Sequence, residues 1–193
     1  MPGSIKIDDG SGNYTILTNA GSLGSDKTIT IPNETATLAT TTATEIDVWA
    51  LTANIAGTNA DITSNLARAT GTNIANKGTG MTESSGIFTF PSTGYWQVTA
   101  KGYVQVLDDT SAVIAIKTTD NNSTYTNVSY TGAGHRSTAE AHHNIETSII
   151  LEIDDTSNDK VKFATISFES DSTLQGDATG LDTRFTFVKL GDL

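Results

Sequence analysis

The stretch that decides the fold is residues 85–106, SGIFTFPSTGYWQVTAKGYVQV. From position 96 onward its side chains alternate at a period of two, which places one set on each face of a strand. One face carries Trp96, Val98 and Ala100 and continues to Val106, whereas the other face carries polar residues and two tyrosines. The pattern predicts a long β-strand with one buried face.

A short corner precedes this strand. Phe88 and Phe90 share one face of an earlier strand, and residues 91–94, PSTG, follow them. Proline fixes φ and lacks a backbone donor, and glycine tolerates positive φ, so both favour a turn at this point. We therefore expect two successive core strands that meet at this corner.

Further strands follow at intervals that suit a sandwich. The predicted segments are 112–118, 125–130, 143–153, 161–168 and 183–190. No segment has the helical pattern that parallel crossovers need, so the sequence predicts an all-β, antiparallel jelly roll. We expect Trp49 and Trp96 to lie in its core.

The order G-x-F-x-F-P-x-T-G-x-W in residues 86–96 resembles the signature of C1q/TNF-like jelly-roll domains in surface proteins of tailed bacteriophages. In that family an aromatic closing strand lies at the C-terminus, and residues 183–190, TRFTFVKL, fit it. The resemblance covers residues 60–193. It implies a sandwich that assembles as a homotrimer, with one sheet facing the threefold axis and distal loops that contact partners.

The polar face of the central strand is the better candidate for an interface. Tyrosine supplies contact area and a polar group at low entropic cost, which suits protein–protein contacts. Together with the resemblance, this gives as trimer-interface candidates Tyr95, Tyr103, Gln105, Phe185 and Phe187. The loops at 131–141 and 170–182 are the candidates for exposed contacts.

Residues 1–40 are predicted to form a small β-rich arm. Short strands alternate with turns, and residues 27–32, KTITIP, give the cleanest strand. The arm is too lean in aliphatic residues for a core of its own, so it needs a partner surface. Its candidate docking residues are Ile5, Ile7, Ile29, Ile31 and Leu38.

Residues 28–40, TITIPNETATLAT, resemble modules near the start of phage fibres and other virion surface proteins. A plain β-hairpin arm is the alternative interpretation. In a virion the arm would dock on the major capsid protein, a tail adaptor or neighbouring protomers. We divide the chain into a docking arm at 1–40, a linker and capping strand at 41–61, and a jelly roll at 62–193.

Composition excludes several classes of function. The chain has 11 Lys and Arg against 22 Asp and Glu, for a net charge of −11, which argues against binding to nucleic acid phosphates. It has no cysteine, so disulfides, thiolate nucleophiles and cysteine-bound zinc are excluded. No signal-peptide pattern and no long apolar run is present, so we expect neither signal-directed secretion nor membrane insertion.

Residues that could carry chemistry give no catalytic pattern. The histidines are His135, His142 and His143, and the adjacent pair would point to opposite faces of a strand, which disfavours a shared metal. We favour a structural or solvated role for them over a metal or a pH-sensing role at a trimer interface. The acidic turns at 8–9 and 154–159 lack the spacing of a calcium loop, so turn formation explains them better. We expect no cofactor and no metal.

The sequence therefore predicts a non-enzymatic virion surface protein of a tailed phage. The favoured interpretation is a homotrimeric capsid decoration protein, of the cement or head-fibre type, that docks through residues 1–40. The alternative is a tail-fibre or receptor-binding tip that contacts host surface carbohydrate. A carbohydrate-active enzyme is a remote third interpretation, since no G-x-S-x-G elbow is present.

Overall fold

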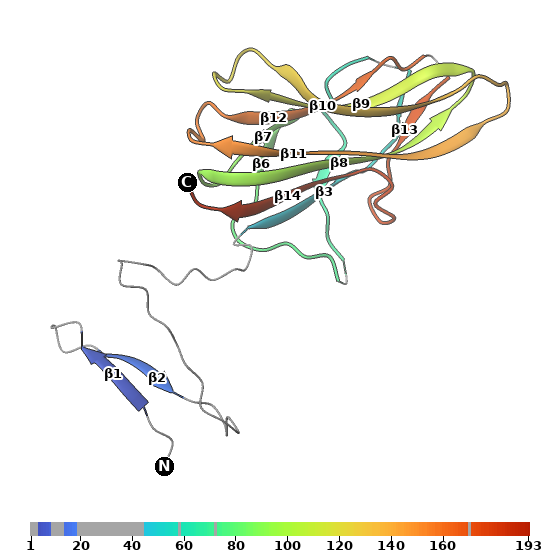
Figure 1. The fold of residues 1–193 in the computed structure, drawn as a ribbon. Coiled ribbons are helices and arrows are strands. Elements are labelled where there is room, and N and C mark those ends of the chain that lie inside the picture. Colours follow the sequence, from blue (N-terminus) through green and yellow to red (C-terminus); the bar gives the residue numbers. More distant parts are fainter. Residues whose placement is uncertain (1–3, 9–13, 19–44, 58, 72, 170) are drawn as a thin grey trace. The chain divides into compact units, whose positions relative to one another are not determined.

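The structure, a computed structural model, describes residues 4–8, 14–18 and 45–193 except 58, 72 and 170 (Figure 1). The chain divides into two units, Met1–Thr40 and Thr41–Leu193. In the first unit, β1 (Ser4–Asp8), which contains Ile5 and Ile7, pairs antiparallel with β2 (Tyr14–Thr18). The predicted strand at 27–32 and the docking candidates Ile29, Ile31 and Leu38 lie outside the described residues.

The second unit is built from strands. They are β3 (Ile46–Leu51), β4 (Ile55–Ala56), β5 (Leu66–Arg68), β6 (Thr82–Ser84), β7 (Ile87–Thr89), β8 (Gly94–Val106), β9 (Asp109–Thr119), β10 (Thr126–His135), β11 (Ala141–Ile153), β12 (Lys160–Ile166), β13 (Thr173–Gln175) and β14 (Arg184–Gly191). No helix occurs among the described residues, and hence none that could cross a membrane. The all-β prediction is confirmed.

The strands form two antiparallel sheets that pack as a sandwich (Figure 1). The five-stranded sheet has the order β10-β9-β12-β7-β6. In the seven-stranded sheet, β11 pairs with one edge of β8, and β14 and β13 share the other edge. Beyond β14 the sheet continues with β3 and β5, and beyond β13 with β4. The strand predicted as a cap, β3, is thus paired on both edges.

The core lies between the two sheets. The alternating face of β8 turns inward, and Trp96, Val98 and Val104 have no exposed surface. Both tryptophans belong to the core, as predicted, since Trp49 is only 9% exposed. Aromatic rings fill much of the space, namely those of Phe88, Phe90, Phe163, Phe185 and Phe187. Phe163 stacks on Phe185 with ring centroids 4.0 Å apart.

Two glycines of the corner motif are required by the backbone. Gly86 has φ of 82° and Gly94 has φ of 136°, conformations that residues with a side chain rarely adopt. A Cβ atom on Gly86 would lie 2.1 Å from the Ile62 carbonyl oxygen, and one on Gly94 would lie 2.4 Å from the Gly191 carbonyl oxygen. The corner therefore lets two other chain segments approach the strands closely.

One predicted loop is partly a strand. Residues 131–135 were expected in the loop at 131–141, but they continue β10 as far as His135. Gly132 pairs with Val113 and Ala133 with Ala112 of β9, so sheet hydrogen bonding outweighs the low strand preference of the glycines. The connection between β10 and β11 is left with residues 136–140.

Candidate interaction surface

The outer face of the seven-stranded sheet carries three of the predicted interface residues. Tyr95, Tyr103 and Gln105 alternate with the buried residues of β8, so they point away from the core, as expected. Tyr95 is 42% exposed. The face extends across β11, β8 and β14, whose register places matching residues side by side.

An apolar row crosses one end of this face. Gln97 of β8 lies between Ile150 of β11 and Val188 of β14, and Val188 is followed by Ile46 of β3. Ile150 is 62% exposed, more than most aliphatic side chains in a folded protein. Tyr95 follows on the same face of β8, so an aromatic ring borders the row.

Polar rows fill the middle of the face. Thr99 and Ser148 share a hydrogen bond of 3.0 Å between their hydroxyls, and the next row sets Lys101 between Glu146 and Arg184. Small hydroxyls and charges at this position give the centre of the face a hydrophilic surface.

An aromatic pair lies at the other end of the face. Tyr103 stacks on His142 with ring centroids 5.2 Å apart and an interplanar angle of 17°. A ring nitrogen of His142 is 2.6 Å from a carboxylate oxygen of Glu140, and the Gln175 amide donates to Gln105 at 2.7 Å. The stacking of His142 on Tyr103 could not be predicted from the sequence, because it depends on the register between β8 and β11.

The two phenylalanines of the closing strand do not lie on the surface. Phe185 and Phe187 have no exposed surface, because both rings point into the sandwich of a single chain. The prediction that they belong to a trimer interface is therefore wrong. Their alternation identified a buried face correctly, but that face meets the second sheet rather than a second chain.

The two adjacent histidines separate as expected. His142 pairs with Gln105 on the outer face, whereas His143 pairs with Val104 on the inner face. The Nε2 atom of His143 is buried without a hydrogen-bond partner. Across the described residues, no group of three or more acidic, histidine or cysteine side chains is arranged to hold a metal.

The acidic turn at 154–159 uses its carboxylates to shape the backbone. Asp159 accepts hydrogen bonds from the amides of Asp154 and Asp155, at 3.0 and 2.9 Å. Asp155 in turn accepts from the Ser157 amide at 2.8 Å, which holds the pKa of Asp155 below its usual value. These contacts fit the turn-forming role predicted for the segment. In the other acidic turn, at 8–9, Asp9 lies outside the described residues.

A buried carboxylate ties the start of β9 to the loop before β13. Asp109 has no exposed surface and accepts hydrogen bonds from the Ser111 amide at 2.9 Å, the Glu169 amide at 3.0 Å and the Ser172 hydroxyl. Burial alone would raise the pKa of Asp109, but these hydrogen bonds together outweigh burial and lower it.

Acid should therefore remove the contribution of Asp109 to stability. A carboxyl with a lowered pKa stabilises the fold fully above its unfolded pKa of about 3.9, and this stability is lost as the pH falls through the lower folded value. We expect Asp109→Asn to lower the free energy of unfolding at pH 7, and the gap to the wild type to shrink towards pH 2. Urea denaturation at both pH values tests this. A gap that stays constant with pH would contradict it.

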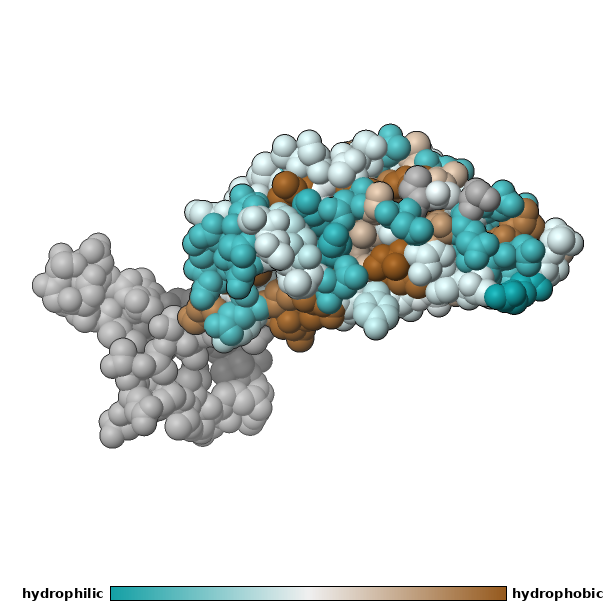
Figure 2. Space-filling model, turned by 90° about the horizontal axis from the view of Figure 1, so that it is seen from above, coloured by the Kyte–Doolittle hydropathy of each residue, from teal (hydrophilic) through white to brown (hydrophobic). Residues whose placement is uncertain are grey.

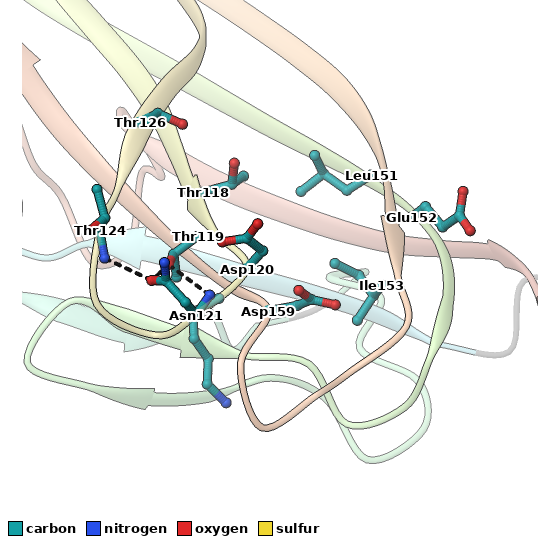
Figure 3. A pocket seen from close by; sticks show the side chains of 11 residues that line it. Thr118, Thr119, Asp120, Asn121, Thr124, Thr126, Leu151, Glu152, Ile153 and Asp159 are labelled. Carbon is teal, nitrogen blue, oxygen red and sulfur yellow. Dashed lines mark hydrogen bonds between the residues drawn. The ribbon is translucent and has the colours of Figure 1, made fainter.

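A pocket opens between the edges of the two sheets, beside the turn from β9 to β10 (Figure 3). Its volume is about 360 Å³. It is lined by threonines, acidic residues and the end of β11, namely Thr118, Thr119, Asp120, Asn121, Thr124, Thr126, Leu151, Glu152, Ile153, Asp159 and Lys160. Sequence reasoning missed this pocket, because its walls come from two turns that only the fold brings together.

Comparisons with known proteins agree on the fold. No family model and no curated protein matches the chain. The chain is similar in structure to Eiger TNF from S. frugiperda, with a TM-score of 0.58 and 11% identity over 79% of this chain and 96% of that chain. The globular domain of zebrafish complement 1qA protein gives a TM-score of 0.50 and 7% identity over 77% of this chain and 99% of that chain.

A phage protein is also among the similar structures. PRD1 vertex protein P5 gives a TM-score of 0.47 and 17% identity over 78% of this chain and 99% of that chain. That TM-score is too low to establish that the two proteins share a fold. Identities this low show the fold alone, and the C1q/TNF-like jelly roll predicted from the sequence is confirmed.

Proposed function

We propose that the chain is a structural protein of a tailed-phage virion, a homotrimeric capsid decoration protein that docks through residues 1–40. The C1q/TNF-like fold of the body agrees with the resemblance of residues 86–96 to the phage domains of that type. The resemblance of residues 28–40 to virion modules supports the role of the arm. We base the proposed self-association on the residues exposed on the outer face of the seven-stranded sheet.

That face has the composition of a modest protein–protein interface. Ile150 and Tyr95 are exposed beside Val188 and Ile46, and the polar rows in the middle of the face border them on one side. Interfaces commonly combine an apolar or aromatic centre with a polar rim. Figure 2 shows another view of the surface, in which brown apolar areas are separated by teal hydrophilic ones. We propose that protomers pack through the row from Ile150 to Ile46 and through Tyr95 beside it. Tyr103 and Gln105 would contribute at the other end of the face.

Self-association can be measured directly. Sedimentation velocity or light scattering should give the full chain a mass three times the 20.2 kDa of one subunit. We expect Ile150→Glu to convert the trimer into monomers, because three buried carboxylates would lack partners at the interface. Circular dichroism should show an unchanged β spectrum, since the side chain is exposed in one chain.

A matched variant controls for the added charge. Thr82→Glu places the same side chain on β6, at the far edge of the five-stranded sheet, and should leave the mass unchanged. A wild-type chain that sediments as a monomer at tens of micromolar would refute the homotrimer. If the Ile150→Glu chain stays trimeric, the interface lies on another surface of the protein.

Particle experiments separate capsid decoration from the tail-fibre alternative. A chain that lacks residues 1–40 should keep the β spectrum of the body but no longer join particles. Particles without the protein should lose heat or osmotic stability while adsorption to the host persists. Loss of adsorption with stable heads would instead support a receptor-binding tip, and electron microscopy of labelled particles would locate the protein.

A further inference from the structure

The pocket beside the turn from β9 to β10 has an apolar floor. Leu151 and Ile153 point towards it from β11, and both pack against the core cluster (Figure 3). Leu151 is only partly buried although it belongs to the inward-facing set of its strand. The edges of β10 and β11 are therefore separated enough at this end for a small apolar group to reach the core.

The walls of the pocket are polar and negatively charged. Thr118 and Thr126 line one side, and the side chains of Asp120 and Asp159 border the same open space in Figure 3. Among the described residues, no hydrogen bond or ion pair reaches the Asp120 carboxylate. Lys160 also lines the pocket, but its ammonium donates to the Thr156 carbonyl oxygen rather than to Asp120 or Asp159, and three acidic residues outnumber it in the lining.

The turn that carries Asp120 is held in place by its own hydrogen bonds. The Asn121 side-chain oxygen accepts from the Thr119 hydroxyl at 2.9 Å and from the Thr124 amide at 2.9 Å (Figure 3). It also accepts from the Ser123 amide at 3.0 Å. The backbone that carries Asp120 is thus held near the mouth, and the turn does not use the exposed Asp120 carboxylate, which leaves it available to a ligand.

From this arrangement we propose that the pocket binds a primary ammonium group on a short alkyl chain. The methylene groups lie on Leu151 and Ile153, and the ammonium donates to Asp120, Asp159 and the threonine hydroxyls. Ammonium groups pair well with carboxylates in partly buried sites, and an anionic ligand would be repelled. Two sources supply this chemistry, a free alkylamine and a lysine side chain of a polypeptide. The inference goes beyond the proposed virion role and does not depend on it.

Titration of the full-length protein with matched probes tests the proposal. Nα-acetyl-lysine methylamide should bind about tenfold more tightly than Nα-acetyl-norleucine methylamide, which has the same alkyl chain without the charge. Binding should shift the NMR methyl signals of Leu151 and Ile153 and weaken with added salt. n-Butylamine with equal affinity would indicate a free amine as the ligand, and weaker binding would indicate a polypeptide lysine.

Two substitutions, each of which removes one negative charge, distinguish binding in the pocket from general electrostatic attraction to the protein. Asp120→Asn should weaken binding of the lysine derivative about tenfold. Asp154→Asn, in the next turn and outside the pocket lining, should change it less than twofold. Equal effects of both substitutions, equal binding of the norleucine derivative, or preferential binding of methyl glucoside would overturn the proposal. None of these outcomes bears on the mass of the trimer or on particle docking.

Discussion

Phe187→Ala should lower the free energy of unfolding by about 3–5 kcal/mol, the range for removing a buried aromatic side chain. The ring of Phe187 has no exposed surface. Its centroid lies 5.1 Å from that of Phe88, 6.0 Å from that of Phe163 and 6.3 Å from that of Phe90. Three aromatic neighbours from other segments of the chain cannot all move to fill the space, so a cavity would remain between the sheets.

Urea denaturation at a fixed protein concentration measures this loss, since the proposed association would also contribute to apparent stability. Leu190→Ala is the matched control, because Leu190 lies on the same strand but is 51% exposed. We expect the control to change stability by less than about 0.5 kcal/mol. Similar losses for both variants would contradict the burial of Phe187.

Asp47→Ala should have an effect of comparable size. Asp47 on β3 is 1% exposed and accepts hydrogen bonds from the Trp49 indole at 2.8 Å, the Met81 amide at 2.7 Å and two nitrogens of Arg68 at 2.8 and 3.1 Å. Alanine would leave the buried Trp49 indole and Met81 amide without this acceptor, whereas Arg68 is 40% exposed and keeps the Met81 carbonyl oxygen as a partner. Each buried donor left without a partner costs about 1–3 kcal/mol.

The ion pair of Lys189 and Asp192 supplies the comparison, since its carboxylate is exposed and the Lys189 ammonium also donates to the Ser92 hydroxyl at 3.1 Å. Its nitrogen–oxygen distance is 2.6 Å, but the Asp192 side chain is 88% exposed. Asp192→Ala should therefore lower the free energy of unfolding by no more than about 1 kcal/mol. The Asp47→Ala variant should also be cut more readily by protease near residues 70–80, because Arg68 and Met81 flank that segment. A loss at Asp47 no larger than that at Asp192 would rule out the buried network as a major source of stability.

The sequence predicts the long strand β8 well, because alternation of Trp96, Val98 and Ala100 with polar residues depends on neighbours along the chain. It could not decide what the aromatic face of β14 packs against. An alternating strand looks the same whether its apolar face meets a second sheet or a second chain. Phe185 and Phe187 were misassigned for this reason.

Contacts between distant segments explain the other differences. The residues near Asp47 in the sequence do not predict that its partners are Arg68 and the Met81 amide. A charged residue within an apolar run is also not predicted to be buried. The pocket likewise joins residues 118–126 to residues 151–160, which only the sandwich topology brings together. Charge argued only against nucleic acid as a partner, and the position of the pocket could be known only from the fold.

The place of β14 in its sheet has a consequence for synthesis of the protein. It is inserted between β8 and β3, and residues 184–191 are translated after both neighbours, so this strand completes a layer whose other members are already made. Until residues 184–191 emerge, facing borders of β3 and β8 present unpaired amides and carbonyls. A chain terminated before residue 184 would hence be prone to aggregate.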